Sequence, residues 1–195
     1  MQEDYTELVV EGSFALVKGF LIGFRYGSGN EFNYFFHHKS GIRRDTLAEL
    51  LKEILDMDNY VHLCLEKNIV DIFKQAVLKA KPLIGIDVKK ERQIKEARFN
   101  FSFSINNREA AERVKEMLNK LPPGVELEDY QPQEESHPEG EGGTGGYAPL
   151  HPYSFKSDGT VKGNFGAVME LFLKAKRMPE SELMFLSEIV LGFED

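Results

Sequence analysis

Residues 97–105 have the sequence ARFNFSFSI, in which apolar and polar side chains alternate without a break. This alternation is typical of a β-strand with one face in an apolar core. The apolar face would carry Phe99, Phe101, Phe103 and Ile105. The opposite, polar face would carry Asn100, Ser102 and Ser104. Because phenylalanines at this spacing need a dry surface to pack against, the stretch predicts a sheet covered on one side only.

One helix is predicted before this strand in the sequence, and one after it. Residues 69–79 place apolar side chains at helical spacing, and Pro82 indicates where that helix ends. Asn107 is a suitable N-cap for a helix over 108–120, which the Pro-Pro-Gly sequence at 122–124 would stop. Further strands are expected at 60–66, 83–88 and 125–130.

The central part of the chain therefore has the expected element order strand-helix-strand-strand-helix-strand. Since each strand-helix-strand crossover is right-handed, two such halves form a four-stranded antiparallel sheet with both helices on one face. We expect residues 59–130 to form a ferredoxin-like unit of this kind, and the fold class to be α+β.

The terminal segments predict a second unit of the same type. The helix starts at Gly12-Ser13-Phe14 and Gly163-Asn164-Phe165 resemble each other, and strands are expected before and after each helix. Residues 1–58 and 147–195 would then form a discontinuous outer unit, with the glycine-rich, acidic residues 131–146 as a flexible linker. Alternatively, the N-terminal segment continues into the central unit, and the C-terminal segment forms a separate layer.

More local elements are expected within these terminal segments. They are strands at 5–11 and 32–38, helices at 14–26, 46–56 and 165–177, a hairpin at 153–162 and a long apolar strand at 183–193. The aromatic and apolar content of the strand expected at 183–193 exceeds what one covered face needs. It therefore predicts a contact between sheets or between subunits, and self-association of the protein.

Composition narrows the functional classes. A formal net charge of −8 makes a nucleic-acid partner unlikely, because phosphate backbones would be repelled overall. The single cysteine, Cys64, excludes an intrachain disulfide and fits a reducing compartment. No secretory signal is visible, and the longest apolar stretch spans only residues 14–24. These features predict a cytoplasmic protein without a membrane span.

The polar face of the central sheet is the predicted ligand-binding site. Side chains two residues apart on a strand share a face, so the strand at 60–66 would display Tyr60, His62, Cys64 and Glu66. The strand at 97–105 would add Asn100, Ser102 and Ser104 beside them. No metal site is expected, because only two soft-metal ligands are visible locally. His37 and His38 are adjacent and would point to opposite faces.

No catalytic motif, and no phosphate-binding or nucleotide-binding loop, is present in the sequence. The leading hypothesis is a non-catalytic binding or regulatory protein with a small-molecule or protein partner. Whether the protein is an enzyme, and whether it uses a cofactor, is left open. One alternative is a metal-assisted hydrolase using His62 and Glu66 with His137 or His151. The other is a nucleic-acid adaptor that binds through a basic hairpin at 89–98.

Overall fold

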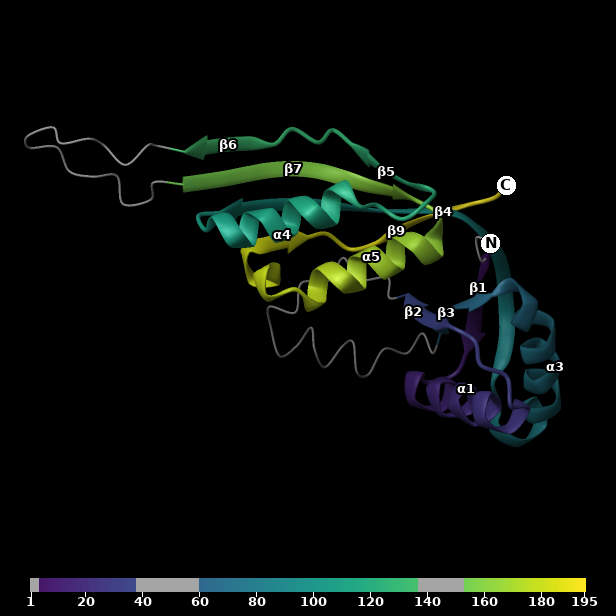
Figure 1. The fold of residues 1–195 in the computed structure, drawn as a ribbon. Helices are drawn as coiled ribbons and strands as arrows, with labels where there is room; N and C mark the ends of the chain where they lie inside the picture. Colours follow the sequence, from purple (N-terminus) through teal and green to yellow (C-terminus); the bar gives the residue numbers. More distant parts are fainter. Residues whose placement is uncertain (1–3, 38–59, 137–152) are drawn as a thin grey trace, which may run out of the picture. The chain divides into compact units, whose positions relative to one another are not determined.

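The computed structural model describes residues 4–37, 60–136 and 153–195, and the fold within them is α+β, with four α-helices and antiparallel strands (Figure 1). The predicted helix at 46–56 and residues 137–146 of the predicted linker lie outside the described residues. No helix in the described part of the chain is both long enough and apolar enough to cross a membrane. The chain divides into two compact units, one reaching to Ile94 and including Phe193–Asp195, the other spanning Lys95–Gly192.

In its described residues, the first unit contains two helices and four strands. Its elements are β1 (Tyr5–Glu11), α1 (Phe14–Ser28), β2 (Tyr34–His37), β3 (Tyr60–Glu66), α3 (Lys67–Ile84) and the first part of β4 (Asp87–Ile105). The strands lie side by side in the order β2-β3-β1-β4, and every neighbouring pair is antiparallel. Strands that are neighbours in this sheet are therefore far apart in the sequence.

Local sequence signals account for the ends of these helices. Ser13 accepts a hydrogen bond from the backbone N–H of Leu16 at 3.2 Å and so caps α1. α3 begins earlier and ends later than predicted, and Pro82 lies inside it. Its end is set by Gly85, whose φ of 73° is in the left-handed region that glycine adopts at low cost.

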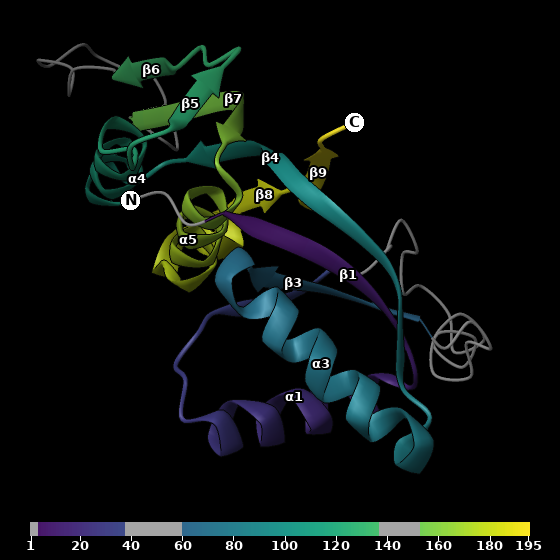
Figure 2. The same ribbon diagram turned by 90° about the vertical axis from the view of Figure 1, so that its right-hand side faces the viewer.

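The core of the first unit lies between the sheet and its two helices, which share one side of β1 and β3 (Figure 2). The sheet supplies alternate apolar side chains such as Leu8 and Leu63, and α1 supplies Val17 and Leu21. Phe73 of α3 is fully buried, and its ring centroid lies 5.5–5.8 Å from those of two phenylalanines of α1. Edge-to-face aromatic contacts of this kind hold α3 against α1.

The second unit continues from the same long strand. Its elements are the part of β4 from Lys95, α4 (Arg108–Asn119), β5 (Val125–Glu128), β6 (Gln133–Ser136), β7 (Tyr153–Gly163), α5 (Phe165–Arg177), the 3-10 helix η1 (Pro179–Leu183), β8 (Met184–Leu186) and β9 (Val190–Phe193). β4 pairs with β7 on one side and β8 on the other, and β7 also pairs with β5 and β6. The central strand order is thus β8-β4-β7-β5.

The alternation at 97–105 is confirmed: the phenylalanines and Ile105 are buried, and the polar residues between them are exposed. Phe99 meets Phe172 of α5 at 5.1 Å between ring centroids. The predicted caps Asn107 and Asn164 accept hydrogen bonds at the starts of α4 and α5. In β7, Gly159 is required because a Cβ there would lie 2.6 Å from the ring of Phe101.

Three local predictions are wrong because strands are longer or shorter than expected. The strands predicted at 83–88 and 97–105 are not separate strands: residues 83–84 end α3, and residues 87–105 form one continuous strand, β4. The basic hairpin at 89–98 therefore does not form. The hairpin predicted at 153–162 is likewise a single strand, β7. The long strand predicted at 183–193 is divided among η1, β8 and β9.

Two of the positive charges at 89–98 face acids of the neighbouring strand, β1. Lys89 lies 2.8 Å from the carboxylate of Glu11, and Arg92 lies 2.6 Å from that of Glu7. The boundary between the two units falls inside β4, between Ile94 and Lys95, and Gln133–Ser136 form a strand that pairs with β7.

We expect Phe73→Ala to destabilise the protein by about 3–5 kcal/mol, because it empties the contact between α1 and α3. Urea unfolding followed by circular dichroism measures the change. The neighbouring Ile72, whose side chain is 48% exposed, is the matched control, and Ile72→Ala should cost less than about 1 kcal/mol. Equal losses in the two variants would contradict this packing.

Candidate functional sites

The structure separates the two groups of predicted site residues. Tyr60, His62, Cys64 and Glu66 lie on β3 in the first unit, whereas Asn100, Ser102 and Ser104 lie on the second part of β4, in the second unit. β3 does not pair with β4: β1 lies between them and pairs with β4 only over residues 87–93. The expectation that both groups share one face of neighbouring strands is therefore wrong, and each group is considered separately.

The four β3 residues do not form an open polar surface. Tyr60 is half exposed and His62 partly buried, but Cys64 is only 1% exposed and Glu66 8%. The Glu66 carboxylate accepts a hydrogen bond of 2.7 Å from the backbone N–H of Asn33. Burial, together with the nearby Glu7 carboxylate, raises the pKa of the Cys64 thiol well above its usual range. Cys64 is thus a neutral, unreactive thiol at physiological pH.

The residue at the centre of this face is Glu7 on β1, which was not among the predicted site residues. Its side chain is completely buried. One carboxylate oxygen, Oε1, lies 2.6 Å from Nδ1 of His62, and the other, Oε2, accepts a hydrogen bond of 2.6 Å from Nη2 of Arg92. Oε1 also lies 3.5 Å from Nδ1 of His37. Two histidines and an arginine therefore surround one buried carboxylate.

Strand register explains this arrangement. Glu7 is directly opposite Arg92 on β4 and Cys64 on β3. His62 is two residues from Cys64 and therefore on the same face, and β2 places His37 directly opposite His62. The site needs three strand pairings between segments that are distant in the sequence. The available sequence signal was an acid, Glu7, in the interior of β1.

The electrostatics of Glu7 are set by competing effects. Burial by itself raises its pKa, but His37, His62 and the Arg92 charge together outweigh burial and hold the pKa well below its usual range. Arg92 in turn stacks on Phe193, with its guanidinium carbon 3.7 Å from the ring centroid. Glu7 is therefore ionised, and its charge is compensated inside the first unit.

The same three side chains satisfy the geometric requirement for holding a metal ion. Glu7, His37 and His62 each offer one ligand atom, and these atoms all lie within 4.8 Å of one another. His62 and Cys64 are close together in the sequence, whereas His37 reaches the site through the pairing of β2 with β3. His38, His137 and His151 lie outside the described residues.

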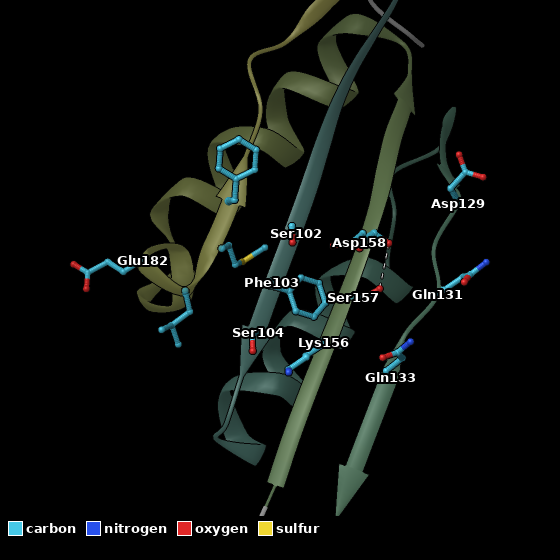
Figure 3. A pocket seen from close by; sticks show the side chains of 13 residues that line it. Ser102, Phe103, Ser104, Asp129, Gln131, Gln133, Lys156, Ser157, Asp158 and Glu182 are labelled. Atoms are coloured by element: carbon cyan, nitrogen blue, oxygen red, sulfur yellow. Dashed lines mark hydrogen bonds between the residues drawn. The ribbon is translucent and has the colours of Figure 1, made fainter. Parts of the chain in front are cut away.

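The second unit has a groove on its polar sheet face (Figure 3). It has a volume of about 810 Å³ and is formed by β4, β7, the β5–β6 segment and the η1–β8 segment. Ser102 and Ser104, two of the predicted ligand-binding residues, line it. Asn100 does not line it; its side chain accepts a hydrogen bond from Thr160, and its backbone N–H donates to Ser187.

The groove combines hydrogen-bonding, charged and apolar side chains. Three of its four ionisable side chains are carboxylates, from Asp129, Asp158 and Glu182, and the fourth is Lys156. Apolar contact area is available at one rim, where Leu183 is 51% and Phe185 67% exposed. Asp129 has a φ of 54°, an unusual conformation for a residue other than glycine. The groove can therefore contact a ligand that has both a charged and an apolar part.

The buried Glu7 pair makes stability depend on pH. In metal-free protein, Glu7→Gln should lose about 2 kcal/mol at pH 7, because it leaves Arg92 without its partner. Since the folded-state pKa is lowered, the wild-type advantage is complete above the ordinary Glu pKa of 4.5 and shrinks as pH falls below it. Urea unfolding at pH 7 and near pH 3.5 tests this; a deficit that is constant with pH would contradict it.

Comparison with known proteins gives no family for this chain: no family model and no curated protein matches it. Among solved structures, the chain is similar to one described as an unknown protein from Galdieria sulphuraria. The two are 13% identical over 99% of each chain, with a TM-score of 0.29.

Proposed function

We propose that the protein is a non-catalytic binding protein whose groove in the second unit takes an organic cation with an apolar part. The observation that carries this proposal is the groove itself, whose lining includes three carboxylates, an exposed aromatic ring and two serine hydroxyls. The cation could belong to a free amine or to a lysine or arginine of a protein partner. Both sources present the same chemistry to the groove.

The negative charge of the groove favours a cation over an anion. Its four ionisable side chains sum to a formal charge of −2, from three carboxylates and one ammonium. The whole chain has a formal charge of −8, which attracts cations to its surface. Phe185 and Leu183 offer an apolar surface beside these charges, and an aromatic face also attracts a cation directly.

The fold supports a binding role through its open sheet face. We further propose that each unit is ferredoxin-like. In its favour, the first unit has strand order β2-β3-β1-β4 and the second has the corresponding order β5-β7-β4-β8, with a helix after the first and third strand of each. A sheet of this type keeps one face free of helices, and that face of the second unit contains the groove.

The structure supports the two alternative functions, a hydrolase and a nucleic-acid adaptor, less well than it supports the groove. A hydrolase using His62 and Glu66 would need Glu66 to be available, but its carboxylate is bonded to the backbone of Asn33. A nucleic-acid adaptor would need the basic hairpin at 89–98, which is part of a strand in which Lys89 and Arg92 are paired with acids. The groove is therefore the better-supported site.

A matched pair of ligands tests the groove. Phenethylamine should shift the amide signals of Ser102, Ser104 and Asp158 in two-dimensional NMR spectra, whereas phenylacetate, which has the same ring and the opposite charge, should not. A short peptide with lysine next to phenylalanine distinguishes a protein partner from a free amine. Equal shifts with phenylacetate would contradict a cation site.

Removal of one groove carboxylate provides the variant test. Asp158→Asn should weaken phenethylamine binding by about three- to ten-fold, as expected for the loss of one solvent-exposed charge contact. Glu170→Gln is the control, because it removes the same charge from an exposed position on α5, outside the groove. If both variants weaken binding equally, the effect is one of overall charge and not of the groove.

Self-association is the second part of the proposal. Leu183, Phe185 and Val190 are all more than half exposed and lie close together in the sequence, on η1, β8 and β9. Exposed apolar side chains on short strands favour contact with another protein surface. A second copy of the chain is the simplest partner that offers the same side chains.

Sedimentation velocity measures this association. The wild-type protein should sediment as a dimer at micromolar concentration, and the double substitution Phe185→Ser with Val190→Ser should shift it to monomer. Leu83→Ser is the control, because Leu83 is 86% exposed but lies at the end of α3 in the first unit. A wild-type protein that remains monomeric at about 100 μM would exclude a dimer of even modest affinity.

A further inference from the structure

We propose that Glu7, His37 and His62 in the first unit bind a divalent transition-metal ion. The site is separate from the groove and from the function proposed for it. It also differs from the metal-binding alternative suggested by the sequence, since it uses neither Glu66 nor a histidine from residues 137–151.

The first argument is the convergence of ligand atoms. A Glu oxygen and two imidazole nitrogens lie within 4.8 Å of one another. Ligand atoms bound to one ion at about 2.0–2.2 Å are separated by about 3 Å, so only small movements are needed for all three to coordinate. Each ligand stands on a different strand of one antiparallel sheet, and paired strands hold ligands more rigidly than loops do.

The second argument is an unsatisfied nitrogen. Nδ1 of His37 is buried and has no hydrogen-bond partner, although it faces the Glu7 carboxylate at 3.5 Å. Oε1 of Glu7 is closer to His62, at 2.6 Å, and its separation from His37 Nδ1 is too long for a good hydrogen bond. Buried polar atoms without a partner are rare and costly. An ion between the three side chains would satisfy His37 and His62 at once.

Arg92 has a defined part in this site. It holds Oε2 of Glu7 at 2.6 Å and so turns the other oxygen towards the histidines. Its positive charge also opposes an added cation, which limits the affinity. The side chains of His37 and His62 are 27% and 16% exposed, so an ion can reach their side of the cluster from solvent.

The donor set defines the class of ion. Two imidazoles and one carboxylate suit zinc, iron(II) or cobalt(II), whereas magnesium and calcium prefer oxygen ligands alone. The neutral thiol of Cys64 is not among the three converging ligands. Three protein ligands leave positions for water, which is the arrangement of an accessible site, in contrast to a closed structural one.

Cobalt(II) is the probe for the experiment, because its visible absorption reports nitrogen and oxygen coordination. Full-length protein, freed of metal with a chelator, should bind one ion at the three-residue site, and zinc should displace it. His37→Gln should weaken binding by at least about ten-fold. His37 lies on β2 and is partly exposed, so this variant is expected to fold, which circular dichroism checks.

His151→Gln is the control, since it removes a histidine that the proposed site does not use. Unchanged cobalt binding in this variant, together with the loss in His37→Gln, supports the site. Should His37→Gln fail to fold, X-ray absorption of zinc-loaded wild-type protein must show two imidazoles. The proposal is overturned if the wild-type protein binds no cobalt or if His37→Gln binds it as well as wild type does. It is also overturned if the X-ray absorption spectrum shows fewer than two imidazoles.

Discussion

Both units depend on the pairing of one strand, β4. Residues 87–93 pair with β1, and residues 97–105 pair with β7, so the same 19-residue strand supplies a member to each sheet. Its two parts have different compositions. The first is rich in charge and needs acids on β1 as partners, whereas the second alternates phenylalanine with small polar residues. A substitution that breaks β4 would therefore affect both sheets.

The helices could be predicted from the sequence because their signals are local. Asn107 and Asn164 each cap a helix within three residues of themselves, and the predicted range 165–177 is that of α5. The alternation at 97–105 was similarly informative, since a period of two is visible in nine residues. Such signals require no knowledge of which segments become neighbours.

The strand pairings could not be predicted in the same way, and the errors follow from that. Charges at 89–98 suggested a solvent-exposed turn, because nothing in that segment shows that Glu7 and Glu11 lie beside it. Two of the seven predicted site residues, Ser102 and Ser104, line a groove, while His62 and Cys64 lie in a different environment. Glu7 and His62 are 55 residues apart, and only the register of β1 and β3 brings them together.

The two candidate sites differ because the sheet faces on which they lie, the faces turned away from the helices, differ in burial. In the first unit, that face contains the buried Tyr5, Glu7 and Cys64, so any charge there must be compensated by groups within the protein or by a bound ion. In the second unit, Ser102, Lys156 and Asp158 are exposed, and their charges and hydroxyls are solvated or available to a ligand. The proposed metal site would select a small ion through its convergent ligand atoms. The proposed groove site would instead select an organic ligand by shape and charge. The difference in burial between the two faces accounts for these two proposed kinds of recognition.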